Sequence, residues 1–350
     1  MSVSSLHKIP SDNSSAGKER IAWLDIARGA SILLVVVFHA SIYLDSHGVI
    51  NPIYWKINNL FAAIRMPLFF GISGLLGVRL LQLDLKAVLL RKTAMLWYLY
   101  TLWTAVHWIF GLSQNKELSL TDLLSSLLFP HQVLWFIWAL GIYFLIAKLV
   151  SVHLRFPVII ASLGIATLVH AEMLLVNYPP FFKSVVYLPY FLSCIWFSEF
   201  IYKLMIVGWK RLVILLAMYS TLFYGMYSNI IGPVTQPILN ILGLFVGAAI
   251  SHQIVYIKPA SELLKSLGKR TLEIYLIHSI IILSLSSVLD WAVISNLKMA
   301  DLWILPLVCI IAIMGALAIK RISDHLGVYW LYALPHWLSS LAKAEKIAPN

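Results

Sequence analysis

The sequence has few charged residues. Only 12% of its 350 residues are Asp, Glu, Lys or Arg, whereas 61% are hydrophobic. A soluble protein averages about 25% charged residues, so the composition excludes an ordinary soluble protein and indicates an integral membrane protein. Cysteine is scarce as well, because only Cys194 and Cys309 are present and both fall inside apolar runs. We therefore expect buried free thiols and no disulfide framework.

The N-terminal residues lack the apolar segment and cleavage site of a signal peptide. Residues 1–20 are polar and serine-rich, which predicts a disordered cytoplasmic tail. The chain also lacks an internal repeat of fixed period, and it lacks a linker long enough to hold a soluble domain. A single helical membrane domain is the organisation that remains.

Apolar segments of spanning length recur along the whole chain. A transmembrane helix needs roughly 20 apolar residues. Ten segments qualify, at residues 26–44, 58–80, 94–112, 132–150, 156–174, 184–203, 211–228, 236–256, 271–290 and 302–320. We predict an all-α, polytopic membrane helix bundle with about ten transmembrane helices.

The basic residues predict the orientation of this bundle. With the N-terminus inside, 21 of the 26 Lys and Arg residues fall on the cytoplasmic side, four fall outside and Arg65 lies within a span. Basic residues concentrate in cytoplasmic loops, so both termini are predicted to be cytoplasmic. The same bias accounts for the net charge of +11 without a nucleic-acid partner.

The first predicted helix carries ionisable residues in the stretch "WLDIARGASILLVVVFHAS" (23–41). Arg28 and His39 project from nearly one face, roughly 16 Å apart along the axis, and Asp25 lies one turn before Arg28. An elongated ligand with an anionic end, such as acyl-coenzyme A, suits this spacing. Arg28 would bind phosphate and His39 would act as a general base. The alternatives are an interfacial anchor for Arg28 and an inter-helix hydrogen bond for His39.

Further polar residues lie inside other predicted spans. Arg65 lies about 10 Å below the outer surface, near the depth of His39, where it would stabilise an oxyanion or orient an acceptor. Its alternative is snorkelling to the outer interface. His107 and His278 are candidates for substrate contact, with a structural hydrogen bond as the equal alternative. Trp135 is a candidate for stacking on a sugar, or for the interfacial belt.

Four features in chain order resemble the acyltransferase-3 family of membrane O-acyltransferases. They are the Arg-x10-His spacing of the first helix and the blocks "RMPLFFGISGLL" (65–76), "VLWFIWALGIYF" (133–144) and "TLEIYLIHS" (271–279). The resemblance implies transfer of an acyl group, usually acetyl, from cytosolic acyl-coenzyme A to a carbohydrate hydroxyl. It implies that Arg28 and His39 are the essential pair.

The chain departs from the family pattern near the third predicted helix. Many members have Arg-x-x-Arg there, whereas this chain reads "LLRKTAMLW" (89–97), with Arg91 and Lys92 present and alanine at position 94. We assign Arg91 and Lys92, together with Arg28, to the acyl donor. Asp25 joins His39 and Arg65 in the predicted catalytic group.

These expectations define one candidate enzyme and one rival. The enzyme comprises a membrane domain at 21–325 and a cytoplasmic tail at 326–350. It is expected to use acyl-coenzyme A, acetyl-coenzyme A by family default, and no metal. It is expected to reside among the lipids of the plasma membrane, which in a bacterium is the inner membrane. Its acceptor is a carbohydrate or glycan, and transfer is direct or proceeds through acyl-His39. The rival is a transporter of an anionic metabolite that uses Arg28, Arg65 and His39 as a substrate path and proton relay. The missing repeat symmetry weighs against the rival.

Overall fold

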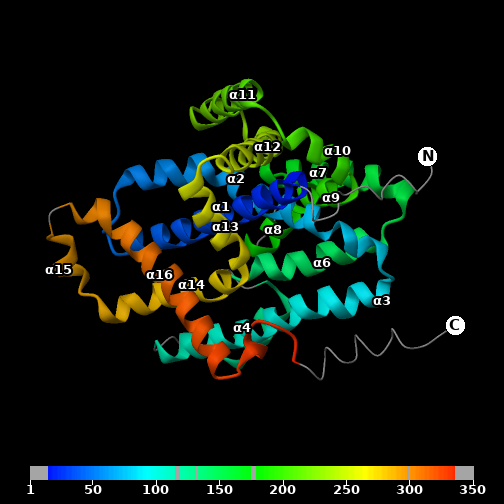
Figure 1. Cartoon of the computed structure of the whole chain (residues 1–350). Helices are drawn as coiled ribbons and strands as arrows, with labels where there is room; N and C mark the ends of the chain where they lie inside the picture. The colour runs from blue at the N-terminus through cyan, green and yellow to red at the C-terminus, as the bar shows by residue number, and fades with distance from the viewer. Residues whose placement is uncertain (1–14, 115–118, 131–132, 175–178, 298, 336–350) are drawn as a thin grey trace.

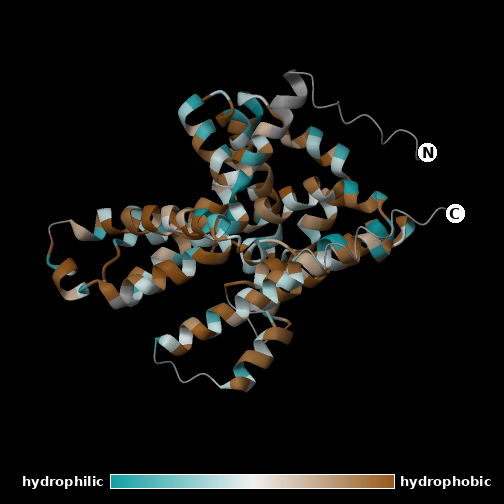
Figure 2. Ribbon diagram, turned by 60° about the horizontal axis from the view of Figure 1, so that its bottom comes forward, coloured by the Kyte–Doolittle hydropathy of each residue, from teal (hydrophilic) through white to brown (hydrophobic). Residues whose placement is uncertain are grey.

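The structure is a computed structural model that describes residues 15–114, 119–130, 133–174, 179–297 and 299–335. Most of the predicted tails at 1–20 and 326–350 lies outside these residues. Every regular element in the described part is a helix (Figure 1), which confirms the all-α prediction. Hydrophobic residues dominate most of these helices (Figure 2).

The helices follow one another with short connections. In chain order they are α1 (Ser15–Ser46), α2 (Pro52–Gly77), η2 (Val78–Gln82), α3 (Leu85–Val88), η3 (Leu89–Thr93), α4 (Ala94–Ser113), α5 (Leu120–Leu128), α6 (Trp135–Leu149), η4 (Val152–Leu154), α7 (Arg155–His170), α8 (Pro179–Val186), α9 (Leu188–Trp196), α10 (Ser198–Met205), α11 (Trp209–Tyr227), η5 (Pro233–Thr235), α12 (Gln236–Ile254), α13 (Lys258–Lys269), α14 (Thr271–Val288), α15 (Trp291–Ser295), α16 (Ala300–His325) and η6 (Tyr329–Leu331).

Each of the ten predicted spans overlaps helix, but fewer helices meet the length and hydropathy of a full crossing. Among the described residues, five segments qualify, at Ala22–Ser46, Pro52–Gln82, Val152–His170, Pro233–Ile254 and Ala300–His325. The chain is therefore a multi-pass helical membrane protein, while the count of ten and the side of the termini stay predictions.

The sixth predicted span, 184–203, is not one straight helix. Its apolar residues are divided between Phe181–Trp196 and Ser198–Met205, which meet at an angle of 99°. The break falls at Phe197, between α9 and α10, whereas Pro189 lies in the first turn of α9, where a proline is tolerated. The bend makes this segment a broken span or a re-entrant loop.

The N-terminal boundary also differs from the prediction. Helix α1 begins at Ser15, so residues 15–20 are helical although the composition assigned them to a disordered tail. This short stretch contains Ala, Lys, Glu and Arg, which are good helix formers and can extend a helix that the membrane span has already nucleated. Residues 1–14 lie outside the described part of the chain.

Helix α1 is at the centre of the bundle (Figure 1). It packs against α2, α12, α13, α14 and α16. Cys194 and Cys309 are buried and free, as predicted. In this position the polar side chains of α1 face protein on most sides, which is how such groups are tolerated within a membrane.

Two glycines allow α13 to lie directly on the first half of α1. A Cβ atom added at Gly29 would lie 2.0 Å from the carbonyl oxygen of Leu264, and one added at Gly268 would lie 1.9 Å from that of Asp25. Small residues permit such close backbone contact between membrane helices. The contact fixes the segment of α1 that carries Asp25 and Arg28.

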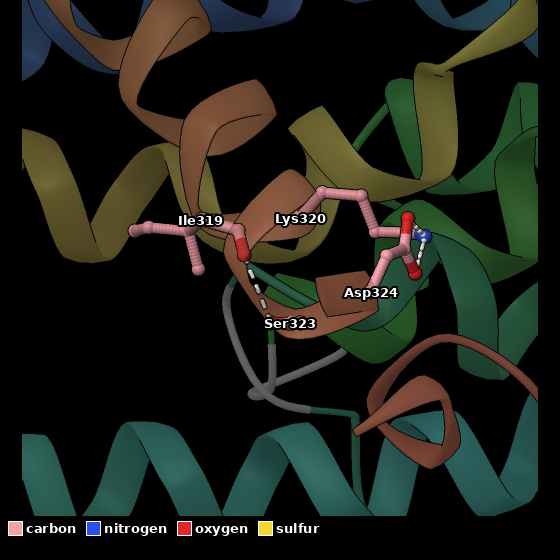
Figure 3. Close-up of polar contacts among 4 residues, drawn as sticks. All are labelled: Ile319, Lys320, Ser323 and Asp324. Atoms are coloured by element: carbon pink, nitrogen blue, oxygen red, sulfur yellow. Dashed lines mark hydrogen bonds and ion pairs between the residues drawn. The ribbon is translucent and has the colours of Figure 1, made fainter. Parts of the chain in front are cut away.

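The segment after α16 docks on α4. The indole Nε1 of Trp103 donates a hydrogen bond of 2.7 Å to the carbonyl oxygen of Leu331, and Tyr332 is buried with its ring centroid 6.0 Å from that of Trp103. On the last turns of α16, Lys320 pairs with Asp324 (Figure 3), and its ammonium lies 5.0 Å from the centroid of the Tyr332 ring. The beginning of the predicted C-terminal tail is therefore packed against the helix bundle.

The glycine contact between α1 and α13 predicts a stability effect. Gly268→Ala should lower the melting temperature of the protein in detergent, because overpacking a tight contact costs about 1–3 kcal/mol. Gly164→Ala in α7 is the matched control, since no atom lies within 4 Å of its added Cβ. The control should be neutral or slightly stabilising, because alanine favours a helix over glycine by roughly 0.5–1 kcal/mol. Equal melting temperatures for the two variants would contradict the close contact.

Candidate active site

Arg28 is held between α1 and the start of α14. Its Nη2 donates a hydrogen bond of 2.8 Å to Oγ1 of Thr271, and its Nη1 lies 3.9 Å from Oδ1 of Asp25, one turn earlier on α1. Thr271 is buried, whereas Arg28 remains partly exposed. The predicted pairing of Asp25 with Arg28 is present, and it orients a guanidinium that keeps donors available to a ligand.

Arg28 and Thr271 line a cavity of about 280 Å³. Lys92 lines the same cavity and is close enough to Arg28 for their charges to repel. Most of the remaining wall is apolar, from residues such as Phe69, Leu140 and Phe144. Two cations on a mostly apolar wall suit a ligand with an anionic group and an apolar portion.

The structure separates the two adjacent basic residues Arg91 and Lys92. Both lie in η3, a short π-helix, a distortion that often occurs at functional sites. Lys92 lines the cavity and its ammonium lies 5.5 Å from the centroid of the Phe144 ring. Arg91 is exposed and does not belong to the cavity lining.

Farther along α1, His39 meets His278 of α14. Nδ1 of His39 lies 2.9 Å from Nε2 of His278, and the ring centroids are 5.1 Å apart in a stacked arrangement. Nδ1 of His278 lies 3.0 Å from the carbonyl oxygen of Ile274 and 2.9 Å from that of Tyr275. His278 is fully buried, whereas His39 keeps part of its side chain exposed.

Arg65 of α2 lies on the other side of Phe38, the neighbour of His39 in sequence. Its Cζ is 4.0 Å from the centroid of the Phe38 ring, a cation–π contact. The side chain is only 8% exposed, and among the described residues no group accepts a hydrogen bond from its Nη1. The charges of Arg65 and of Lys183 on α8 both act on His39. The neighbourhood of His39 is thus electropositive.

Tyr275 connects the cavity with the histidine pair. It lines the cavity, and its ring centroid lies 6.1 Å from that of His278. Its hydroxyl donates to the carbonyl oxygen of Val133 at 2.5 Å, and its ring packs against Phe136, which in turn stacks on Phe69 at 4.3 Å between centroids. Tyr275 is therefore a lining residue of the cavity that also contacts His278, while neither His39 nor His278 belongs to the lining.

Trp135 and His107 are not part of this arrangement. Trp135 is buried in an aromatic cluster, with its ring centroid 5.7 Å from that of Phe70 and 5.8 Å from that of Tyr187. His107 is buried on α4 and is not among the cavity residues. Their roles in substrate binding remain predictions, without support from the contacts seen at these two side chains.

Several residues of the site could not be singled out by their sequence context. Thr271, Tyr275 and Phe38 are common in apolar helices, and Lys183 falls in a predicted outer loop. The one available signal was the pair Tyr275 and His278 within "TLEIYLIHS", which are three residues apart and share a helix face. The described residues contain no group of three or more His, Cys, Asp or Glu that could hold a metal ion.

Comparison with known proteins adds one finding. A family model described as an acyltransferase domain matches residues 21–321, which is most of the chain. No curated protein and no solved structure matches. The matched range contains every residue that lines the cavity and both histidines of the pair.

The different placement of Arg91 and Lys92 predicts different effects on anion binding. Coenzyme A carries the anionic part of the donor expected from the sequence, and Lys92→Gln should weaken its binding about 10- to 100-fold, because a hydrogen bond to a charged group contributes about 1.5–3 kcal/mol. Arg91→Gln, the matched control, should bind coenzyme A within about twofold of the native protein, a difference of well under 1 kcal/mol. Isothermal titration of the protein in detergent measures both. A larger loss in Arg91→Gln than in Lys92→Gln would contradict the cavity as the anion site.

Proposed function

The chain belongs to the acyltransferase-3 family, and we propose that it moves an acyl group, acetyl by family default, from acyl-coenzyme A to a carbohydrate hydroxyl of the cell envelope. The observation that carries the proposal is the surroundings of His39. This partly exposed histidine is hydrogen-bonded to His278, and nearby lies the buried guanidinium of Arg65, whose Nη1 has no hydrogen-bond partner among the described residues. A general base beside a cationic group is what acyl transfer to a hydroxyl needs.

The cavity at the first half of α1 is the binding site for the anionic part of the donor. Arg28 and Lys92 supply positive charge, and Thr271 holds Arg28 in place. The arginine fork suits phosphate oxygens, and the lysine acts as a second point charge. The chain of the donor then extends along α1 past Tyr275, over the roughly 16 Å that the helical rise places between Arg28 and His39.

At the far end His39 acts on the acceptor. Its imidazole takes the proton of the acceptor hydroxyl as the oxygen attacks the thioester carbonyl carbon. A new C–O bond forms, the C–S bond breaks, and the departing thiolate takes the proton from the imidazolium. The step produces an ester and free coenzyme A thiol, and it needs no oxidant, reductant or metal.

Arg65 stabilises the negative charge that develops on the thioester carbonyl oxygen. A buried donor without a partner is costly to maintain, and Nη1 of Arg65 has no partner within the part of the chain that the structure describes. Fixed donors in a water-poor site stabilise an oxyanion strongly, because they require no reorganisation during the reaction. Phe38 holds the guanidinium against its ring and beside His39.

The transporter of an anionic metabolite is the second candidate, and the same residues would line its path. Transfer is favoured because His39 is bonded to a buried histidine and lies near an aromatic group, an arrangement suited to a fixed base. A transporter would release an intact anion from loaded vesicles, whereas an enzyme would convert acyl-coenzyme A to free thiol and an acylated acceptor.

Replacing His39 should abolish transfer. His39→Ala should reduce acyl transfer by at least about 10²-fold, the lower end of what a general base contributes. The assay combines mass spectrometry of cell-envelope glycans with release of coenzyme A thiol by protein in nanodiscs. His153→Ala, an exposed histidine of η4, is the control and should be fully active. Undiminished acylation by His39→Ala would refute the proposed chemistry.

Replacing Arg65 should act on turnover and spare donor binding. Arg65→Gln should lower kcat about 10²- to 10³-fold, as loss of an oxyanion donor does, with little change in the affinity for coenzyme A. Arg65→Lys should recover part of the loss, because the charge returns without the fork. Steady-state kinetics and titration separate the two effects. A variant that loses donor affinity and keeps its turnover would place Arg65 in binding instead.

A further inference from the structure

We propose that His278 is a positioning residue that fixes the tautomer of His39, so that Nε2 of His39 is the nitrogen that accepts the proton. This inference rests on the proposed function, because it concerns the group that serves there as the base. It assigns to His278 a task other than the substrate contact expected from the sequence.

The backbone of α14 determines where His278 carries its proton. Nδ1 of His278 lies within 3.0 Å of the carbonyl oxygens of Ile274 and Tyr275. A carbonyl oxygen can only accept a hydrogen bond, so this nitrogen must be the N–H donor. A neutral imidazole has one donor and one acceptor nitrogen, and Nε2 of His278 is therefore the acceptor.

The same reasoning shows which nitrogen of His39 carries the proton. Nε2 of His278 accepts a hydrogen bond, and the atom 2.9 Å away is Nδ1 of His39, which must then carry the proton. The remaining nitrogen of His39, Nε2, is left with its lone pair. No other described residue forms a hydrogen bond with the His39 ring. The second nitrogen is therefore available to an acceptor hydroxyl.

The imidazole rings of His39 and His278 differ in burial, and this difference suggests different roles for them. His278 is 0% exposed, so substrate cannot reach it, while His39 is partly exposed. In catalytic triads a buried carboxylate holds the base histidine in the correct tautomer. Here a neutral histidine anchored on backbone carbonyls would provide the same orientation without placing a negative charge within the membrane, where a charge is costly.

The hydrogen-bond chain persists through the reaction. When Nε2 of His39 takes the proton, both of its nitrogens are donors, and Nδ1 continues to donate to Nε2 of His278. The His278 proton stays on Nδ1, bonded to the helix carbonyls. One proton enters His39 from the hydroxyl and leaves with the thiolate, so His278 undergoes no net change.

Two substitutions at His278 separate this role from a merely structural one. In His278→Gln the side-chain amide reaches about as far as Nε2, and its oxygen can accept from Nδ1 of His39. In His278→Asn the shorter amide can donate to the helix carbonyls but leaves His39 without an acceptor. We expect kcat to fall about 10²-fold in His278→Asn with KM unchanged, the scale of a lost general base, and to stay within about fivefold of the native value in His278→Gln.

The tautomer can be observed directly in the native protein. ¹⁵N NMR of protein with its 11 histidines labelled distinguishes protonated from unprotonated ring nitrogens, and the His39→Ala spectrum identifies the signals of His39. We expect a single His39 tautomer protonated at Nδ1. It should persist in His278→Gln and be lost in His278→Asn.

The outcomes distinguish this inference from the proposed function. A native His39 protonated at Nε2 would overturn the inference, as would equal kcat losses in the Asn and Gln variants with an unchanged tautomer. If His39→Ala remains fully active, the proposed function fails, while the NMR experiment still decides the hydrogen-bond direction. Because the native spectrum needs no variant at His278, misfolding of those variants leaves the test intact.

Discussion

A polar side chain within a membrane helix has no water to bond, so it must find a partner in the protein itself. Helix α1 carries Asp25, Arg28 and His39, and it lies at the centre of the bundle. Two of these groups are bonded to α14, Arg28 to Thr271 and His39 to His278. The α1–α14 pair thus satisfies the polar groups and holds them in register about three turns apart.

The same constraint draws attention to Arg65, whose Nη1 is not satisfied in this way within the described part of the chain. Arg28 and His39 have protein partners, whereas Nη1 of Arg65 is buried and has none among the described residues. The cation–π contact with Phe38 offsets part of that cost and fixes the guanidinium beside His39. A donor held in this way suits the transient negative charge of an oxyanion. In the proposed function Arg28 therefore binds the donor, whereas His39 and Arg65 take part in the reaction.

Much of this organisation could be predicted because hydropathy, helical periodicity and loop charge are properties of local sequence. The apolar runs predicted the helices, and the 11-residue spacing placed Arg28 and His39 on one face. The interruption at Phe197 and the helical start at Ser15 were not predicted. The helical start extends the first span beyond its apolar residues, and the interruption divides a continuous apolar run. A count of apolar residues therefore shows neither of them.

Composition, spacing and motifs were enough to predict a helical membrane protein of the acyltransferase-3 family with Arg28, His39 and Arg65 as candidate residues, because each of these is a property of the linear sequence. The packing of the helices places Lys92 in the cavity lining and Arg91 outside it, and it brings the buried His278 against His39. Adjacent residues of a π-helix and residues 239 positions apart are related only through packing. The roles of Lys92 and His278 can therefore be inferred only when the packing of the helices is known.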